Sequence, residues 1–174
     1  MSQQLEASAW VPLDTETAFA LAHTLGDDRT AWDSEVESRM LIRAHRELGP
    51  GAQVFERVGN GRRVIVEVDV WHPGQLSSTK LIKGPWWLAE YGEGWHVRPD
   101  EDGSRVTLKL TWRHAAPLFA DAASATLRAS LREELDRRMA DFVVASEDAT
   151  LVSRVRDRMR SGELAPGARH RERR

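Results

Sequence analysis

Three residues in the second half of the sequence are of types that transfer protons. Tyr91 and Glu93 are separated by one residue, and His114 follows near the end of a later apolar segment. Burial of Glu93 would raise the pKa of its carboxyl group and suit it to general acid catalysis, with Arg138 as an anion partner from a helix. The alternative is that each of these residues has only a structural role. Glu93 could face water, and His114 could simply end a strand. Carboxylates with shifted pKa values also occur in pockets that perform no chemistry.

The sequence offers no local motif for a metal or a cofactor. No two histidines are separated by three, four or five residues, which are the spacings typical of zinc sites. Gly59-Asn60-Gly61 lacks the remaining glycine of a dinucleotide-binding loop, and neither GxSxG nor a phosphate-binding loop occurs. We therefore predict no metal and no cofactor.

The composition is that of one folded domain. A chain of 174 residues, 41% hydrophobic and 30% charged, can bury a core. It has no cysteine, which excludes disulfides and thiolate chemistry. The first residues, MSQQLEAS, have neither the basic nor the apolar region of a signal peptide, and no apolar run reaches the roughly 18 residues of a membrane span. We expect a cytoplasmic protein with no membrane span.

Arginines gather at the C-terminal end of the chain. Positions 153–174 hold eight arginines and three acidic residues, although the net charge of the whole chain is -2. Such a tail could contact nucleic acid through its phosphates. No aromatic residue is interleaved to stack on bases, so we prefer a solvated, flexible terminus and do not expect nucleic acid as the partner.

Alternation of apolar and polar residues predicts a strand at the start of the chain and a meander later. The odd positions from Leu5 to Leu13 are apolar, and two short helices are expected to follow, over about 15–25 and 27–32. From Glu35 to Trp112 the pattern predicts about six further strands, the first with Val36, Met40 and Ile42 on one face. Asn60-Gly61 favours positive φ at both of its positions, so it predicts a two-residue hairpin turn.

The pattern becomes helical after Pro117. Apolar residues recur at spacings of three and four from Leu127 to Val143. They predict one long amphipathic helix over about 118–145, with a break conceivable near Asp121, and the inner face of the meander is the surface that it would cover. We expect a ligand-binding domain over 1–146 and a C-terminal extension over 147–174, a short helix followed by a flexible Arg-rich tail.

This order of elements resembles the START-related SRPBCC superfamily, which includes polyketide cyclases and pollen-allergen-type ligand binders. The resemblance runs from Leu5 to Ser146 and rests on WVPLDTETAFAL, TAW, PGAQVFERV, GSRVTLKLTW and the final amphipathic helix. It implies an α+β helix-grip fold, in which a curved antiparallel sheet of about seven strands wraps a long C-terminal helix and two short helices follow the first strand. An NTF2-like cone is disfavoured, because it places its helices mostly before the sheet.

The resemblance also implies that an apolar small molecule binds in a cavity between sheet and helix. The segment KGPWWLAEYGEGWHVRP holds three of the seven tryptophans, and without a bulge Trp87, Tyr91, Glu93 and Trp95 would share its inner face. Two glycines make a bulge conceivable. Each ring alone fits a core role, but together they fit a pocket wall. The expected ligand-binding residues are Trp87, Tyr91, Trp95, Leu110, Trp112, Leu131, Leu135, Arg138 and Met139.

Three functions remain open at this point. The first, which we prefer, is binding of a hydrophobic or aromatic molecule of lipid or polyketide type. The second is a polyketide cyclase- or dehydratase-like enzyme that uses Tyr91 and Glu93. The third is a protein or nucleic-acid interaction module, because Trp10 and Trp71 are predicted on the outer face, where they could form a patch for a homodimer.

Overall fold

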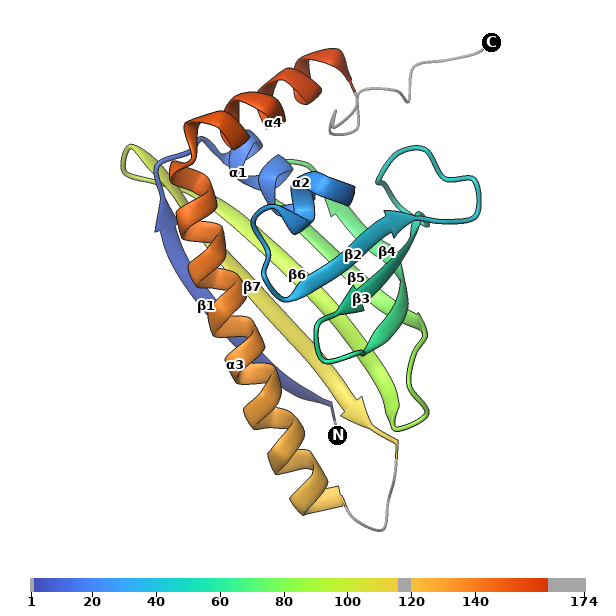
Figure 1. Ribbon diagram of the computed structural model, residues 1–174. Coiled ribbons are helices and arrows are strands. Elements are labelled where there is room, and N and C mark those ends of the chain that lie inside the picture. Colours follow the sequence, from blue (N-terminus) through green and yellow to red (C-terminus); the bar gives the residue numbers. More distant parts are fainter. Residues whose placement is uncertain (1, 116–119, 163–174) are drawn as a thin grey trace.

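The computed structural model describes residues 2–115 and 120–162. These residues form a curved sheet that wraps around a long helix (Figure 1). The seven strands form one antiparallel sheet in the order β1-β7-β6-β5-β4-β3-β2. The helix-grip α+β fold expected from the sequence is confirmed. The elements in chain order are β1 (Gln3–Val11), α1 (Thr15–Ala22), α2 (Gly26–Thr30), β2 (Val36–Leu41), β3 (Gln53–Val58), β4 (Arg63–His72), β5 (Leu76–Lys83), β6 (Leu88–Asp100), β7 (Gly103–His114), α3 (Ala120–Glu147) and α4 (Ala149–Ser161).

The first strand closes the sheet beside the last one. β1 pairs with β7 from Gln3 opposite Trp112 to Val11 opposite Ser104. Asp14 then caps α1, because its carboxylate accepts the amide of Thr17 at 2.8 Å. The chain thus turns from the sheet into a helix within a few residues.

The turn between β3 and β4 differs from the expected one. The amide of Gly61 donates to the carbonyl of Val58 at 2.8 Å, and the amide of Val58 donates to the carbonyl of Arg62 at 2.9 Å. Gly61 has a φ of 82°, whereas Asn60 is not among the residues with positive φ. The loop therefore has three residues and one left-handed position, a common alternative to the two-residue turn.

Bulges in several of the strands change which side chains face the core. In β2 the register shifts between Val36 and Ser38, so Arg39 is buried and Met40 is 48% exposed. The expectation that Val36 and Met40 share a face is wrong. Each bulge adds one residue to one strand, which reverses the alternation beyond it.

The bulge in β4 turns Trp71 toward the core. The register shifts between Val68 and Val70, and the Trp71 ring then lies 5.0 Å from Phe19 and 4.8 Å from His23, edge to face. Its predicted place in an outer patch is therefore wrong. Trp10 does lie on the surface, 37% exposed, and its indole donates to the carbonyl of Asp100 at 3.1 Å.

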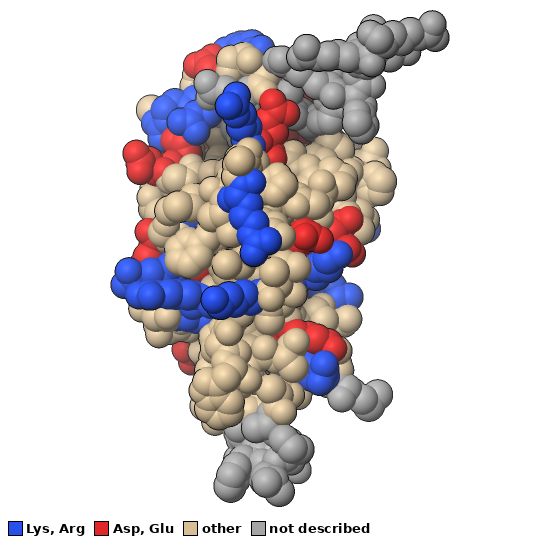
Figure 2. Space-filling view, turned by 90° about the vertical axis from the view of Figure 1, so that its right-hand side faces the viewer, with Lys and Arg blue, Asp and Glu red and all other residues tan. Residues whose placement is uncertain are grey.

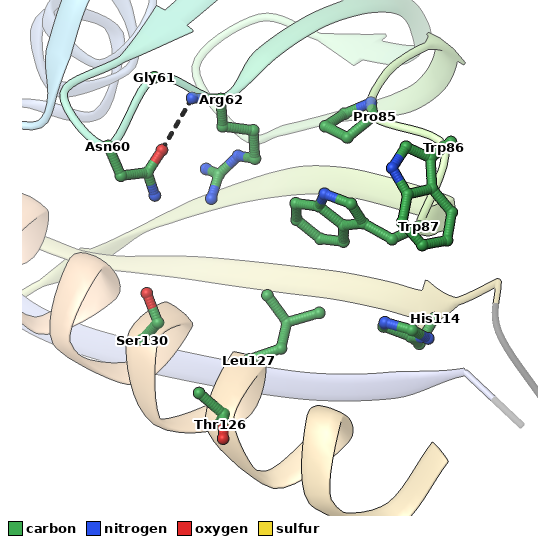
Figure 3. A pocket seen from close by; sticks show the side chains of 10 residues that line it. All are labelled: Asn60, Gly61, Arg62, Pro85, Trp86, Trp87, His114, Thr126, Leu127 and Ser130. Atoms are coloured by element: carbon green, nitrogen blue, oxygen red, sulfur yellow. Dashed lines mark hydrogen bonds between the residues drawn. The ribbon is translucent and has the colours of Figure 1, made fainter. Parts of the chain in front are cut away.

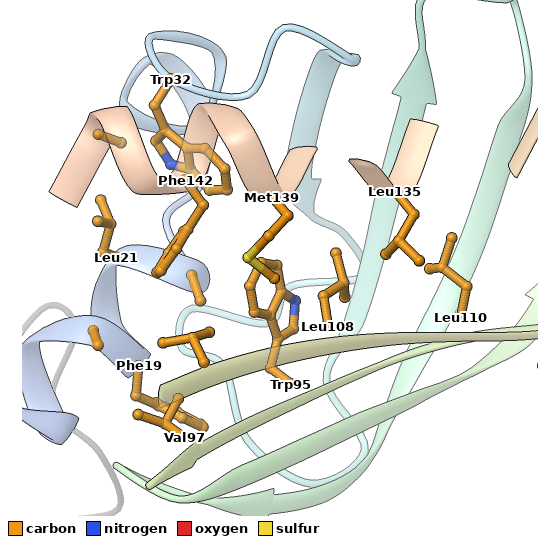
Figure 4. Packing of buried hydrophobic residues seen from close by; sticks show 14 of the residues in the cluster. Phe19, Leu21, Trp32, Trp95, Val97, Leu108, Leu110, Leu135, Met139 and Phe142 are labelled. Carbon is orange, nitrogen blue, oxygen red and sulfur yellow. The ribbon is translucent and has the colours of Figure 1, made fainter. Parts of the chain in front are cut away.

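The core lies between the sheet and α3 (Figure 4). α3 provides Leu135, Met139 and Phe142, and the Phe142 ring lies 5.3 Å from Trp95 of β6. α4 lies across one end of the molecule beside α1 (Figure 1). It adds Leu151, Val152 and Val155 to the same core.

Some sequence expectations fall outside the described residues. These are the first residues of the long predicted helix, at 118 and 119, and the Arg-rich tail from 163 onward. The expectation of a flexible terminus is wrong for 153–161, which belong to α4, where Arg154 and Arg158 pair with Asp28. The domain boundary at residue 146 and the cytoplasmic location stay predictions. Within residues 2–115 and 120–162, no helix is long and apolar enough to cross a bilayer.

Candidate functional site

Ion pairs cross the middle of the space between the sheet and α3. Arg138 of α3 is completely buried and lies between two carboxylates. Its Nη1 donates to Glu93 of β6 at 2.6 Å, and its Nε donates to Asp33, after α2, at 3.0 Å. Asp33 also pairs with buried Arg29 at 2.7 Å. We call the space between the sheet and α3 the grip. At this level the grip is filled by charged side chains.

The same network continues toward the β3–β4 turn. Arg39 of β2 pairs with Glu56 of β3 and lies 3.3 Å from Glu93. Arg62, next to the turn, donates to Glu134 of α3 at 2.6 Å. We call these eight side chains the buried charge network; they are Arg29, Asp33, Arg39, Glu56, Arg62, Glu93, Glu134 and Arg138, all less than 7% exposed.

The network determines the protonation of Glu93 and Tyr91. Burial by itself would raise the pKa of Glu93, but the guanidinium groups of Arg138, Arg39 and Arg29 outweigh it and hold that pKa well below its usual value. The expected raised pKa is therefore wrong. Burial and the charge of Glu93 raise the pKa of Tyr91, whose hydroxyl lies 3.4 Å from Glu93 Oε1. Glu93 is thus an ionised acceptor at neutral pH, and Tyr91 is a protonated donor.

A pocket of about 880 Å³ opens near the start of α3, at the end of the molecule away from α4 (Figure 1 and Figure 3). Four parts of the chain surround it: the β3–β4 turn, the β5–β6 loop, the end of β7 and the first half of α3. The lining residues are Asn60, Gly61, Arg62, Pro85, Trp86, Trp87, His114, Thr126, Leu127 and Ser130.

Aromatic and apolar side chains form much of the wall of this pocket. The ring of Trp87 stacks on His114, with centroids 6.3 Å apart and planes 24° apart. Leu127 of α3 lies on the opposite side of the opening, and Trp86 stands at the rim, 84% exposed (Figure 3). A flat apolar molecule could therefore contact an indole on one side and a leucine on the other.

Arg62 joins the pocket to the buried charge network. Its guanidinium lies 5.1 Å from the centroid of the Tyr91 ring and is paired with Glu134. Its Nε is buried and has no hydrogen-bond partner within the described part of the chain. One donor behind the inner wall of the pocket is thus left unsatisfied.

The predicted site residues divide between the pocket and the core. Of those described, Trp87 and His114 line the pocket. Tyr91 and Glu93 lie in or beside the buried charge network, behind Arg62. The remaining ones are buried in the hydrophobic core or in that network; they are Trp95, Leu110, Trp112, Leu131, Leu135, Arg138 and Met139. Their part in binding or catalysis stays a prediction.

A bulge explains why Trp87 separates from the other tryptophans. β6 begins only at Leu88, and its register against β7 shifts between Leu88 and Glu90. Leu88 is therefore buried and Ala89 exposed, whereas an unbulged strand would give the reverse. Beyond the bulge, Tyr91, Glu93 and Trp95 face inward as expected.

Several pocket residues were not anticipated from the sequence. Arg62 and Asn60 belong to a turn, and Ser130 lies beside the apolar stripe of α3, so each resembles an ordinary surface residue in the sequence. Leu127 is the exception: the sequence indicated that it faces inward, because it is the first apolar residue of that stripe. Within the described ranges, no group of three or more histidine or acidic side chains is placed to hold a metal.

Comparison with known proteins identifies the family. The family model described as polyketide cyclase / dehydrase and lipid transport matches residues 2–147, and the chain belongs to that family. The suspected membership of the SRPBCC superfamily is confirmed. No curated protein matches the sequence closely enough to be counted as a relative.

Solved structures show the same fold at low sequence identity. The Zhui aromatase/cyclase of a Streptomyces species is 15% identical, with a TM-score of 0.67 over 93% of this chain and 98% of that one. A START superfamily protein of Mycobacterium smegmatis is 15% identical, with a TM-score of 0.63 over 80% and 96%. A Thermus thermophilus protein is 21% identical, with a TM-score of 0.61 over 89% and 98%. At these identities the likeness concerns the fold alone.

Proposed function

We propose that the protein binds an apolar or aromatic small molecule, of lipid or polyketide type, in the pocket between the first half of α3 and the β3–β4 and β5–β6 turns. The observation that carries the proposal is this opening of about 880 Å³. Its size is within the roughly 300–1,000 Å³ of ligand sites. Its wall combines the apolar surfaces of tryptophan, leucine and proline with polar side chains that could orient a ligand.

The buried charge network limits how far a ligand can enter. Separating a buried ion pair leaves an uncompensated charge, which costs about 3–5 kcal/mol. Beyond the network, the cavity bordered by Glu93, Trp95 and Trp71 has a volume of only about 10 Å³, which is room for about one water. A ligand therefore binds at the open end of the grip, with Arg62 at its inner boundary.

Arg62 also suggests how the ligand is oriented. The charge of Arg62 is balanced by Glu134, so the unpartnered Nε calls for a hydrogen-bond acceptor rather than a second negative charge. If the Arg62 side chain moves to expose Nε to the pocket, a carbonyl or hydroxyl oxygen of the ligand would accept this bond while the apolar part contacts Trp87 and Leu127.

Binding can be tested with an uncharged fluorescent apolar probe, N-phenyl-1-naphthylamine, and two variants on one helix. Leu127→Arg places a charge in the pocket and is expected to weaken probe binding at least about tenfold. Val144→Arg makes the same change on α3 where the side chain is 70% exposed, and it should bind as the wild type does. Equal affinities in folded Leu127→Arg and wild type would remove the proposal.

A cyclase- or dehydratase-like activity on a polyketide-type substrate is the second candidate. The observation that favours it is the imidazole of His114 on the pocket wall, since histidine is the commonest general acid or base. Glu93 does not suit the role of acid, because it is ionised. If the protein turns over a bound polyketide, His114→Gln should abolish turnover and retain binding, and unchanged turnover would exclude His114 from the mechanism.

A further inference from the structure

The β5–β6 loop exposes apolar and basic side chains together. Trp86, in the loop, is 84% exposed, and Ile82, near the end of β5, is 44% exposed. Lys83 is exposed as well. Ile65 of β4 pairs with Lys83, so exposed Arg63, two residues before Ile65, lies beside the same loop.

Among the described residues, the basic residues beside this loop, Arg63 and Lys83, lack an acidic partner, whereas the nearby Lys80 has two. Lys80 is balanced by Glu67 and Asp69. Within the described part of the chain, Arg63 and Lys83 take part in no ion pair. Figure 2 shows this side of the molecule, where basic side chains cross the middle of the face and acidic ones lie mainly toward its margins.

We propose that the β5–β6 loop docks on the surface of a bilayer that contains anionic lipid. Trp86 would enter the headgroup region, where the amphipathic indole is favourable. Lys83 and Arg63 would contact lipid phosphates, and each basic residue near such a surface strengthens binding about fivefold. The surface is therefore complementary to a negatively charged bilayer in both its apolar and its charged groups.

A bilayer fits this surface better than a protein partner does. A stable protein interface covers roughly 800 Å² on each side, with several buried anchors near its centre. In the loop and the adjoining end of β5, Trp86 and Ile82 are the large apolar side chains that are exposed among the described residues. One protruding indole flanked by basic residues is suited to insertion into the headgroup region of a bilayer.

Docking would also place the pocket opening at the lipid. Trp86 and Trp87 of the same loop line the pocket, so an apolar molecule could pass between bilayer and pocket without crossing water. This consequence rests on the proposed function, whereas the docking itself requires no ligand.

Vesicle sedimentation of the full chain tests the docking. Wild type should bind vesicles of phosphatidylcholine with 40% phosphatidylglycerol more tightly than pure phosphatidylcholine, and less tightly as salt rises. Trp86→Ser and the double change Arg63→Glu with Lys83→Glu should each weaken binding at least about fivefold. Arg98→Glu and Leu76→Ser are matched controls at exposed positions toward the opposite ends of β6 and β5 and should not.

A site-specific label separates the loop from the Arg-rich C-terminus, which could also attract anionic vesicles. The chain has no cysteine, so Trp86→Cys can carry a single nitrobenzoxadiazole label, with Arg98→Cys as control. The label at 86 should shift to the blue and gain intensity on anionic vesicles, and the label at 98 should not. Vesicle binding without a shift at 86, or equal binding by the wild type and the loop variants, would overturn the proposal. Trp86-dependent self-association in place of vesicle binding would also overturn it, in favour of a protein interface.

Discussion

Arg138 and Glu93 join the long helix to the centre of the sheet, with Nη1 and Oε1 2.6 Å apart and both side chains almost completely buried. The same guanidinium holds Asp33 at 3.0 Å. α3 is therefore held by its apolar stripe and also by charges that water does not screen. This pair occupies space that an apolar ligand would fill if the grip were hollow to its centre, and it directs the search for a ligand to the open end.

Arg138→Met should destabilise the protein strongly, because it leaves Glu93 and Asp33 buried without their partner. We expect a loss of about 3–5 kcal/mol in the free energy of unfolding, measured with urea. Arg137→Met is the control, since Arg137 is 56% exposed and pairs with Glu35, and its loss should stay below about 1 kcal/mol. Similar losses for the two variants would show that the network does not stabilise the fold.

His23 should make stability depend on pH in a window where few other groups titrate. Burial, aided by the charges of Arg39 and Arg29, lowers the pKa of His23 to about 3. Its ring is neutral, with Nδ1 bonded to the carbonyl of Phe19 at 2.6 Å and Nε2 to the hydroxyl of Ser77 at 2.7 Å. Below its ordinary pKa of 6.5 the unfolded chain binds a proton that the folded chain does not.

The free energy of unfolding should therefore fall as pH is lowered from 6.5, by about 1.4 kcal/mol per pH unit. Urea denaturation between pH 6 and 5 measures this slope before the carboxylates begin to titrate. His23→Gln should flatten it, whereas His96→Gln, at an exposed position of β6, should leave it unchanged. A slope that persists in a folded His23→Gln variant would assign it to another group.

Gly92 lies just beyond the paired part of β5 and β6, where the two backbones are still close together. The two strands pair only from Leu76 opposite His96 to Ser78 opposite Gly94. A Cβ at position 92 would lie 2.2 Å from the carbonyl oxygen of Thr79, while one at position 94 would have its nearest contact at 3.6 Å. Gly92→Ala should cost about 1–3 kcal/mol of stability and Gly94→Ala about 0.5 kcal/mol or less. Equal denaturation midpoints for the two variants would contradict this close approach.

The C-terminal helix α4 should contribute to the stability of the domain although it follows the matched family region. Leu151 is 2% exposed and belongs to the common core. Leu151→Ala should cost about 2–5 kcal/mol, whereas Val144→Ala, at a position 70% exposed, should change stability by less than about 0.5 kcal/mol. A negligible cost at Leu151 would support a domain that ends at residue 146.

Much of the architecture could be predicted because binary patterns repeat over many residues. Alternation along β7 and the stripe on α3 are long enough to define which faces are buried. The bulges could not be predicted, since a single added residue reverses the face without changing the composition of the strand. Trp71, Met40 and Trp87 were misplaced for this reason.

The buried charge network was harder to predict, because a charged residue in a sequence is usually a solvated one. The signal was nevertheless present in β3, where Glu56 alternates with Val54 and Val58 and so shares their inner face. It was also present in α3, where Arg138 adjoins Met139 within the apolar stripe. Which charges pair across the sheet depends on strand register and helix position, which the local pattern does not contain.

The central claim, that the pocket at the open end of the grip binds an apolar molecule, is tested most directly by native mass spectrometry. Gently purified wild type, Leu127→Arg and Val144→Arg would each be compared with a denatured sample after incubation with a lipid and aromatic polyketide mixture. We predict a discrete mass excess in the wild type and in Val144→Arg that disappears on denaturation and is absent from Leu127→Arg. The mass of the bare chain in all three, or the same excess in Leu127→Arg, would contradict the claim.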